Sequence, residues 1–140
     1  KSMSVRMIIS TASIATLMAG VSACASTATV DEGEIAQATE GYVRTGETRT
    51  CLNPRLIDTI DPVTDSAWRI EMNDGTMYLN IVGGGCNNAS SDFTYLQYET
   101  PTGQLCRGEI VQVVDSNGGM FAGSCGLSEF ERLEPVAGAE

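Results

Sequence analysis

Five cysteines are the residues of this sequence best suited to covalent chemistry, and their odd number needs an explanation. Four of them stand at positions 51, 86, 106 and 125, and the fifth is Cys24. An odd count indicates that one thiol has a separate fate. We therefore expect one modified cysteine and two disulfides, provided that the chain reaches an oxidising compartment.

The residues before the first cysteine indicate what its fate is. Val21-Ser22-Ala23-Cys24 resembles the lipobox of bacterial lipoproteins, an aliphatic residue and two small residues before a cysteine. The resemblance implies a diacylglyceryl group on the Cys24 thiol, cleavage before it and acylation of the new amino group. Two or more acyl chains anchor a protein stably. Because Ala25 rather than aspartate follows, we expect an outer-membrane lipoprotein facing the periplasm. Cleavage after Ala23 would instead give a soluble periplasmic protein.

The segment before Cys24 has the three parts of a secretory signal peptide. Lys1 and Arg6 precede an uncharged apolar stretch from Met7 to Val21, which ends in small residues. At about 15 residues this stretch is shorter than the ~20 that a membrane-spanning helix needs. We expect a signal-peptide helix over 1–23, then a lipidated N-terminus and a flexible acidic linker over 24–47.

The rest of the chain predicts short strands separated by glycine-bearing turns. Residues 66–72 alternate, the pair Asp74-Gly75 is typical of a tight hairpin, and 76–82 forms the return strand. Further strands are expected at 55–60, 93–100, 108–115 and 120–125, while 127–133 forms either a strand or a helical turn. This predicts an all-β fold, a small antiparallel barrel or sandwich of about six short strands, over 48–136 with a tail at 137–140.

Four cysteines allow three disulfide connectivities. We favour Cys51–Cys125, which would tie the ends of the β domain, with Cys86–Cys106, which would bracket the aromatic strand. The alternative is Cys51–Cys86 with Cys106–Cys125, because a turn at Asn117 places the last two cysteines nearly opposite each other. Either pair of disulfides would matter in a domain too small to bury a large core.

Residues 51–135 resemble an uncharacterised proteobacterial family of small exported four-cysteine proteins, domain of unknown function 6491. The matching features are Cys51 ahead of Arg55 and Ile57, the Trp68–Asp74-Gly75–Tyr78 hairpin, Cys86, Leu105-Cys106 with Gly108-Glu109, and Ser124-Cys125-Gly126-Leu127 with Phe130. The resemblance implies a disulfide-bearing β domain and brings no activity with it.

Composition argues against most catalytic machinery. The chain has no histidine, which excludes Ser-His-Asp and Cys-His catalysis and histidine-based zinc sites, and it has no Cys-x-x-Cys pair. Asp58, Asp61 and Asp65 are close in sequence but lack the spacing of a calcium loop. We predict no catalytic residue, no metal and no cofactor. Trp68 and Phe93 are expected in the core.

Charge and aromatic residues indicate the kind of partner. The formal net charge is −10, and from Cys24 onward six basic residues stand against eighteen acidic ones. Such a protein is repelled by nucleic acid. We expect two partners: the membrane, which it contacts through its N-terminal lipid, and a basic envelope protein. The tyrosines Tyr78, Tyr95 and Tyr98 form a possible binding face.

Three hypotheses of function follow. The leading one is a non-catalytic binding or structural module of the cell envelope. The second is a periplasmic inhibitor of a basic hydrolase such as lysozyme, for which opposite charge would speed encounter. The third is a carboxylate-based hydrolase of envelope glycans, whose two acidic residues would be brought together by folding.

Intact mass spectrometry of the protein extracted from bacterial envelopes tests the expected fates of the cysteines. We expect a polypeptide beginning at Cys24, heavier by its acyl chains, and lighter than its reduced form by the hydrogens of four oxidised thiols. A mature protein with an unmodified Cys24 would contradict lipid anchoring, and four free thiols would contradict the disulfides.

Overall fold

The expected all-β fold is confirmed. The computed structural model describes residues 30–83 and 86–138, so the expectations for the signal peptide, the lipobox and Cys24 lie outside the described residues. The elements are α1 (Glu32–Ala38), β1 (Tyr42–Arg49), β2 (Cys51–Leu52), the 3-10 turn η1 (Pro54–Leu56), β3 (Ile57–Asp61), β4 (Ala67–Met72), β5 (Met77–Ile81), β6 (Thr94–Tyr98), β7 (Leu105–Cys106), β8 (Ile110–Asp115), β9 (Phe121–Gly126) and β10 (Phe130–Pro135). In this part of the chain no helix is long and apolar enough to cross a membrane.

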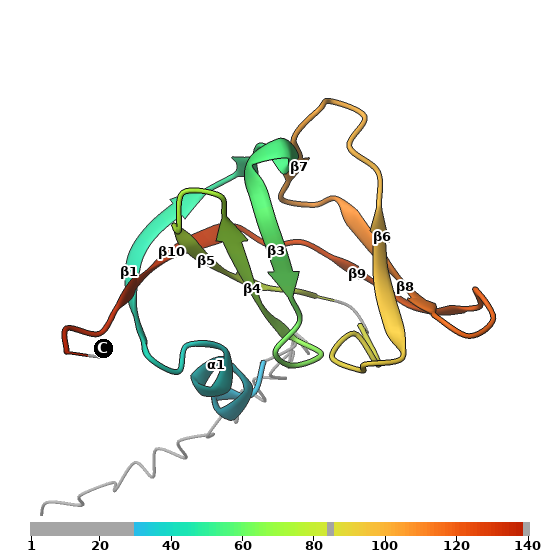
Figure 1. Ribbon diagram of the computed structural model, residues 1–140, viewed down its shortest axis with the longest axis horizontal. Coiled ribbons are helices and arrows are strands. Elements are labelled where there is room, and N and C mark those ends of the chain that lie inside the picture. Colours follow the sequence, from blue (N-terminus) through green and yellow to red (C-terminus); the bar gives the residue numbers. More distant parts are fainter. Residues whose placement is uncertain (1–29, 84–85, 139–140) are drawn as a thin grey trace, which may run out of the picture.

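The strands form two main antiparallel sheets and one short pair. The five-stranded sheet has the order β1-β10-β5-β4-β3, the three-stranded sheet has the order β6-β8-β9, and β2 pairs with β7. An isolated backbone bridge between Gly83 and Gly126 joins the two main sheets on one side. Strands β3 and β6, each an edge strand of its sheet, are labelled in Figure 1 and do not pair with each other. The domain is thus a small barrel that is closed on one side and open on the other.

The hairpin of β4 and β5 forms as the sequence predicts. Gly75 has a φ of +83°, which its lack of a side chain allows, and Glu71 lies opposite Met77. Trp68 and Ile70 point into the space between the sheets and are fully buried. Met77, Leu79 and Ile81 of β5 pack together on the outer face of the sheet beneath α1.

Residues 32–47 belong to the folded domain, which corrects the expected linker over 24–47. Asp31 caps α1 by accepting a hydrogen bond from the N–H of Gly33, and Ala38 is fully buried against Leu79 and Leu133. After α1, β1 pairs with β10 along the edge of the sheet. A helix of seven residues with few apolar side chains shows too little periodicity to be predicted from sequence.

One core fills the space between the sheets. Its buried members come from both sheets and from the short pair: Leu52, Trp68, Ile70, Tyr78, Val82, Cys86, Ala89, Leu105, Val111, Val113, Cys125, Leu127 and Phe130. Asn80 is a fully buried polar residue beside them. Its side-chain oxygen accepts from the N–H of Ser128 at 3.0 Å, and its amide donates to the Ser128 carbonyl at 2.9 Å. These bonds hold the segment that leads from β9 into β10, so the buried amide is satisfied.

The favoured disulfide connectivity is wrong, although all four cysteines are paired. The disulfides are Cys51–Cys106, with Cα atoms 4.0 Å apart, and Cys86–Cys125, with Cα atoms 5.0 Å apart. Cys51 and Cys106 are directly opposite each other in the β2–β7 pair. Cys86 follows the Gly83–Gly126 bridge, which brings it beside Cys125.

Both connectivities considered from sequence fail for identifiable reasons. Cys125 does not mark the end of the domain, because β10 follows it and pairs with β1. The alternative pair, Cys106 with Cys125, fails because the register of β8 and β9 places Val111 opposite Cys125. The strands β2 and β7 have two residues each, too few for an alternating pattern.

Three further expectations are refined. Residues 130–135 form a strand, which decides between the two possibilities left open for 127–133. Trp68 lies in the core as expected, whereas Phe93 is 68% exposed, because it precedes β6 next to the turn that follows β8. Residues 30–83 and 86–138 contain ten strands rather than about six, since β1, β2, β7 and β10 were not predicted as separate strands.

The disulfide between Cys51 and Cys106, which joins β2 to β7, is expected to stabilise the folded protein. In the double variant Cys51→Ser/Cys106→Ser we expect the free energy of unfolding to fall by about 2–4 kcal/mol, because the link closes a long loop in the unfolded chain. Denaturant unfolding followed by circular dichroism measures the loss. Peptide mapping without reduction should join the peptides of Cys51 and Cys106; a peptide joining Cys51 to Cys125 would contradict the structure.

Candidate functional site

A groove opens where the two sheets are not joined, between β3 and β6. Its volume is about 540 Å³. The lining residues come from β3 and its flanking prolines, from the loop before β6, and from β6 itself: Pro54, Ile57, Asp58, Ile60, Asp61, Pro62, Ala89, Ser90, Ser91, Asp92, Thr94, Tyr95, Leu96 and Tyr98. The groove therefore follows directly from the open side of the barrel.

A bulge in β3 shapes one wall of the groove. The register of β3 against β4 shifts between Ile57 and Thr59. In a regular strand, residues three apart point to opposite faces, but a bulge adds one residue and changes the alternation. Ile57 and Ile60 therefore both pack against the core, while Asp58 and Thr59 between them are exposed.

The other wall is β6, a regular strand paired with β8 along its whole length. Leu96 and Tyr98 pack against the core, whereas Tyr95 points outward and is 49% exposed. Tyr95 and Tyr98 of the predicted tyrosine face thus line one groove. Tyr78 does not belong to it: it is 5% exposed and points into the core, because it lies opposite Ile70 on the inner face of the hairpin.

The groove carries negative charge with little local compensation. Asp58, Asp61 and Asp92 line it, and no lysine or arginine is among its described lining residues. Asp61 is paired with Arg69 of β4 at 3.0 Å. Asp58 and Asp92 are exposed and make no ion pair within residues 30–83 and 86–138. A positively charged ligand is therefore the one that these walls favour.

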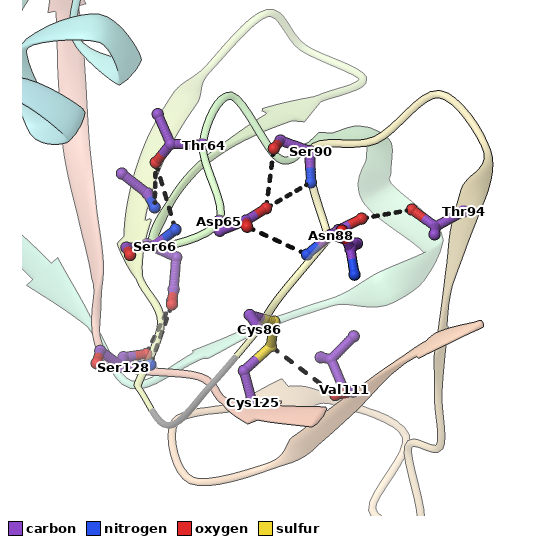
Figure 2. Close-up of a disulfide and its surroundings, with 12 residues drawn as sticks. Thr64, Asp65, Ser66, Cys86, Asn88, Ser90, Thr94, Val111, Cys125 and Ser128 are labelled. Atoms are coloured by element: carbon purple, nitrogen blue, oxygen red, sulfur yellow. Dashed lines mark hydrogen bonds between the residues drawn. A yellow bond between two sulfur atoms is a disulfide. The ribbon is translucent and has the colours of Figure 1, made fainter. Parts of the chain in front are cut away.

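The loop that closes one end of the groove is held by the carboxylate of Asp65. Figure 2 shows this carboxylate between Asn88 and Ser90. It accepts from the N–H of Asn88 at 3.1 Å, and from the N–H and hydroxyl of Ser90 at 3.1 and 2.8 Å. The hydroxyl of Thr94 donates to the Asn88 carbonyl at 2.7 Å, and Cys86 is linked to Cys125. The loop from 86 to 94 is thus attached at both ends and in the middle.

These hydrogen bonds also change the acidity of Asp65. Partial burial raises the pKa of this carboxyl, but the hydrogen bonds from Ser90, Asn88 and Ala89 outweigh it and hold the pKa below its ordinary value. The carboxylate is therefore charged in the folded protein at neutral pH, and it serves to position the loop.

An exposed apolar patch adjoins the groove on the outer face of the three-stranded sheet. Tyr95, Val114 and Phe121 are neighbours across β6, β8 and β9. Phe93 lies beside the turn after β8, since its carbonyl accepts from the N–H of Ser116. We call Phe93, Tyr95, Met120 and Phe121 the aromatic patch; each of them is about half exposed or more. Tyr95 belongs to both the patch and the groove, so the two surfaces are continuous.

The three aspartates considered for calcium have separate roles. Asp65 holds the loop, Asp61 pairs with Arg69, and Asp58 is exposed at the groove. In the part of the chain that the structure describes, no three acidic or thiol side chains are grouped so as to hold a metal ion.

Sequence reasoning did not identify the acidic wall of the groove. It placed a strand at residues 55–60 but did not recognise it as the edge of a sheet. The available signal was the pair Asp58 and Asp61 in a strand bounded by Pro54 and Pro62, a pattern typical of an edge strand. No signal of this kind exists for Asp92, whose place depends on the loop that Asp65 holds.

Comparison with protein-family models, curated proteins and solved structures gives no match to this chain. The resemblance to the exported four-cysteine family therefore stays a prediction.

The hydrogen bonds between Asp65 and the loop predict how the free energy of unfolding depends on pH. Because the folded-state pKa of Asp65 is lowered, its contribution to stability is complete above the unfolded pKa near 3.8 and is lost as the pH falls through the folded value. In Asp65→Asn we expect the free energy of unfolding at neutral pH to fall by about 1 kcal/mol. Urea unfolding at several pH values measures the difference between variant and wild type. A difference that grows below pH ~4 would contradict the assignment.

Proposed function

We propose that the protein is a non-catalytic binding module of the cell envelope, tethered through acylated Cys24, whose β3–β6 groove takes a positively charged partner. The observation that carries the proposal is the composition of the groove. Asp58 and Asp92 are exposed at walls that offer no positive charge, while Ile57 and Leu96 supply apolar contact. Sites of this kind combine apolar surface with a few charges that set orientation.

Its position on the domain also suits a binding site. The groove lies between elements that are fixed independently, β3 by its pairing with β4 and the loop before β6 by Asp65 and Cys86. Both walls are therefore formed before a partner arrives, and less conformational entropy is lost on binding. The aromatic patch beside Tyr95 extends the available surface and offers the large side chains that anchor protein interfaces.

A basic hydrolase such as lysozyme is a second candidate for the partner, and the module would then act as its inhibitor. The acidic groove and the adjoining aromatic patch favour it, because a basic enzyme surface would meet opposite charge and apolar area together. The second candidate requires that binding should lower enzyme activity, which the first does not.

Neutralising the groove tests the proposal against a matched control. The double variant Asp58→Asn/Asp92→Asn removes two carboxylates from the groove; Glu32→Gln/Glu40→Gln removes two exposed carboxylates that do not line it. With an oligolysine peptide at low salt, we expect the groove variant to bind about fivefold more weakly than wild type, and the control nearly as tightly as wild type. Fluorescence anisotropy measures both.

Further measurements distinguish the binding module from the hydrolase inhibitor and from the glycan hydrolase. Equal weakening in both double variants would contradict the groove as the binding site and indicate attraction by overall charge alone. Loss of lysozyme activity with wild type, relieved in the groove variant, would identify the inhibitor. Turnover of purified envelope glycan by wild type, lost in Asp58→Asn, would overturn the non-catalytic proposal in favour of a hydrolase.

A further inference from the structure

The two strand edges that face the groove differ in how they are protected. Strand β3 has the features that prevent pairing with another chain: Asp58 and Asp61 within it, Pro62 directly after it, and a bulge near its start. Charges, prolines and bulges are the devices by which sheet edges avoid unwanted strands. A further strand is therefore disfavoured along β3.

Strand β6 has none of these features. Its five residues, Thr94–Tyr98, contain no charge and no proline, and its register with β8 is regular throughout. Three of its residues, Thr94, Tyr95 and Tyr98, are of types that are enriched in sheets. Among the described residues β6 pairs with no strand other than β8. On its other edge the N–H of Thr94 donates to the Ser91 carbonyl, and the edge beyond Thr94 faces the groove without a strand partner. An unprotected edge of this kind is a template for one more strand.

We propose that the groove binds an extended, basic segment of a partner protein, which adds to the three-stranded sheet as a strand beside β6. This inference rests on the proposed function and specifies how the groove recognises its partner. Main-chain hydrogen bonds to β6 provide affinity that does not depend on sequence, and side-chain contacts in the groove provide selectivity. A segment matching the five residues of β6 would extend about 17 Å.

The groove also specifies the side chains of the segment. In a strand, side chains alternate between two faces. Those that point inward would meet Ile57 and Leu96, which favours apolar residues there. Those that point outward would meet the exposed carboxylates of Asp58 and Asp92, which favours basic residues there. A segment that alternates basic and apolar residues fits these walls.

A second copy of this chain fits the edge poorly. The chain carries a formal net charge of −10, and Asp92 stands two residues before the start of β6. Two such edges brought together would place like charges near each other, which costs free energy at low salt. Charge therefore favours a basic partner over self-association.

Backbone-methylated peptides test the inference without altering the protein. The probe is a labelled peptide that alternates lysine and valine. In an extended peptide, alternate backbone amides point to opposite edges of the strand. One derivative is methylated on the amides of one edge, and a second derivative is methylated on the amides of the other edge. We expect one derivative to bind at least about tenfold more weakly, because its donors to β6 are removed, and the other to bind about as well as the parent. On binding the parent peptide, amide hydrogens of β6 should exchange more slowly, with β3 unchanged. A peptide with glutamate in place of lysine should not bind.

The outcomes separate this inference from the proposed function. If both methylated peptides bind as tightly as the parent while Asp58→Asn/Asp92→Asn still weakens them, strand addition is wrong and the acidic binding site stands. Slower exchange in β3 rather than β6 would also overturn strand addition. If sedimentation shows a dimer with β6 already protected, a second copy occupies the edge and the inference fails. If no basic probe binds the wild type, both proposals fail.

Discussion

A backbone bridge joins the two main sheets along one side, and the rest of the structure depends on that junction. Gly83 and Gly126 exchange backbone hydrogen bonds there, and the disulfide between Cys86 and Cys125 links the same two segments covalently. The junction sets the position of the sheets around Trp68 and thereby encloses the core. Because it closes one side of the barrel, the unpaired strands β3 and β6 remain on the other side and form the groove.

The distribution of ion pairs determines where the negative charge of the protein is uncompensated. On the sheet formed by β1 and β10, Arg44 pairs with Glu131 and Arg132 pairs with Glu47. These pairs are exposed, so they contribute little to stability. Their effect is on the surface potential, since arginines used there do not offset the carboxylates at the groove. The domain thus presents its acidic groove at its open side.

How much of the fold can be predicted depends on the range of the interactions. The β4–β5 hairpin was predicted because Asp74-Gly75 favours a tight turn and the flanking residues alternate. The candidate site was predicted in part: Tyr95 and Tyr98 line the groove, but Tyr78 does not. Tyrosine suits both a core and a surface, so its residue type could not show that Tyr78 lies opposite Ile70 on the inner face.

The sequence by itself determined the class of fold, the turns and the participation of four cysteines in disulfides, because these follow from local backbone preferences and from residue chemistry. The tertiary structure alone decided which cysteines meet, as for Cys51 and Cys106 in strands of two residues each. It also decided that the groove lies between β3 and β6. These features depend on pairings between segments far apart in the chain, whose energies come from the packing of the whole core rather than from any local pattern.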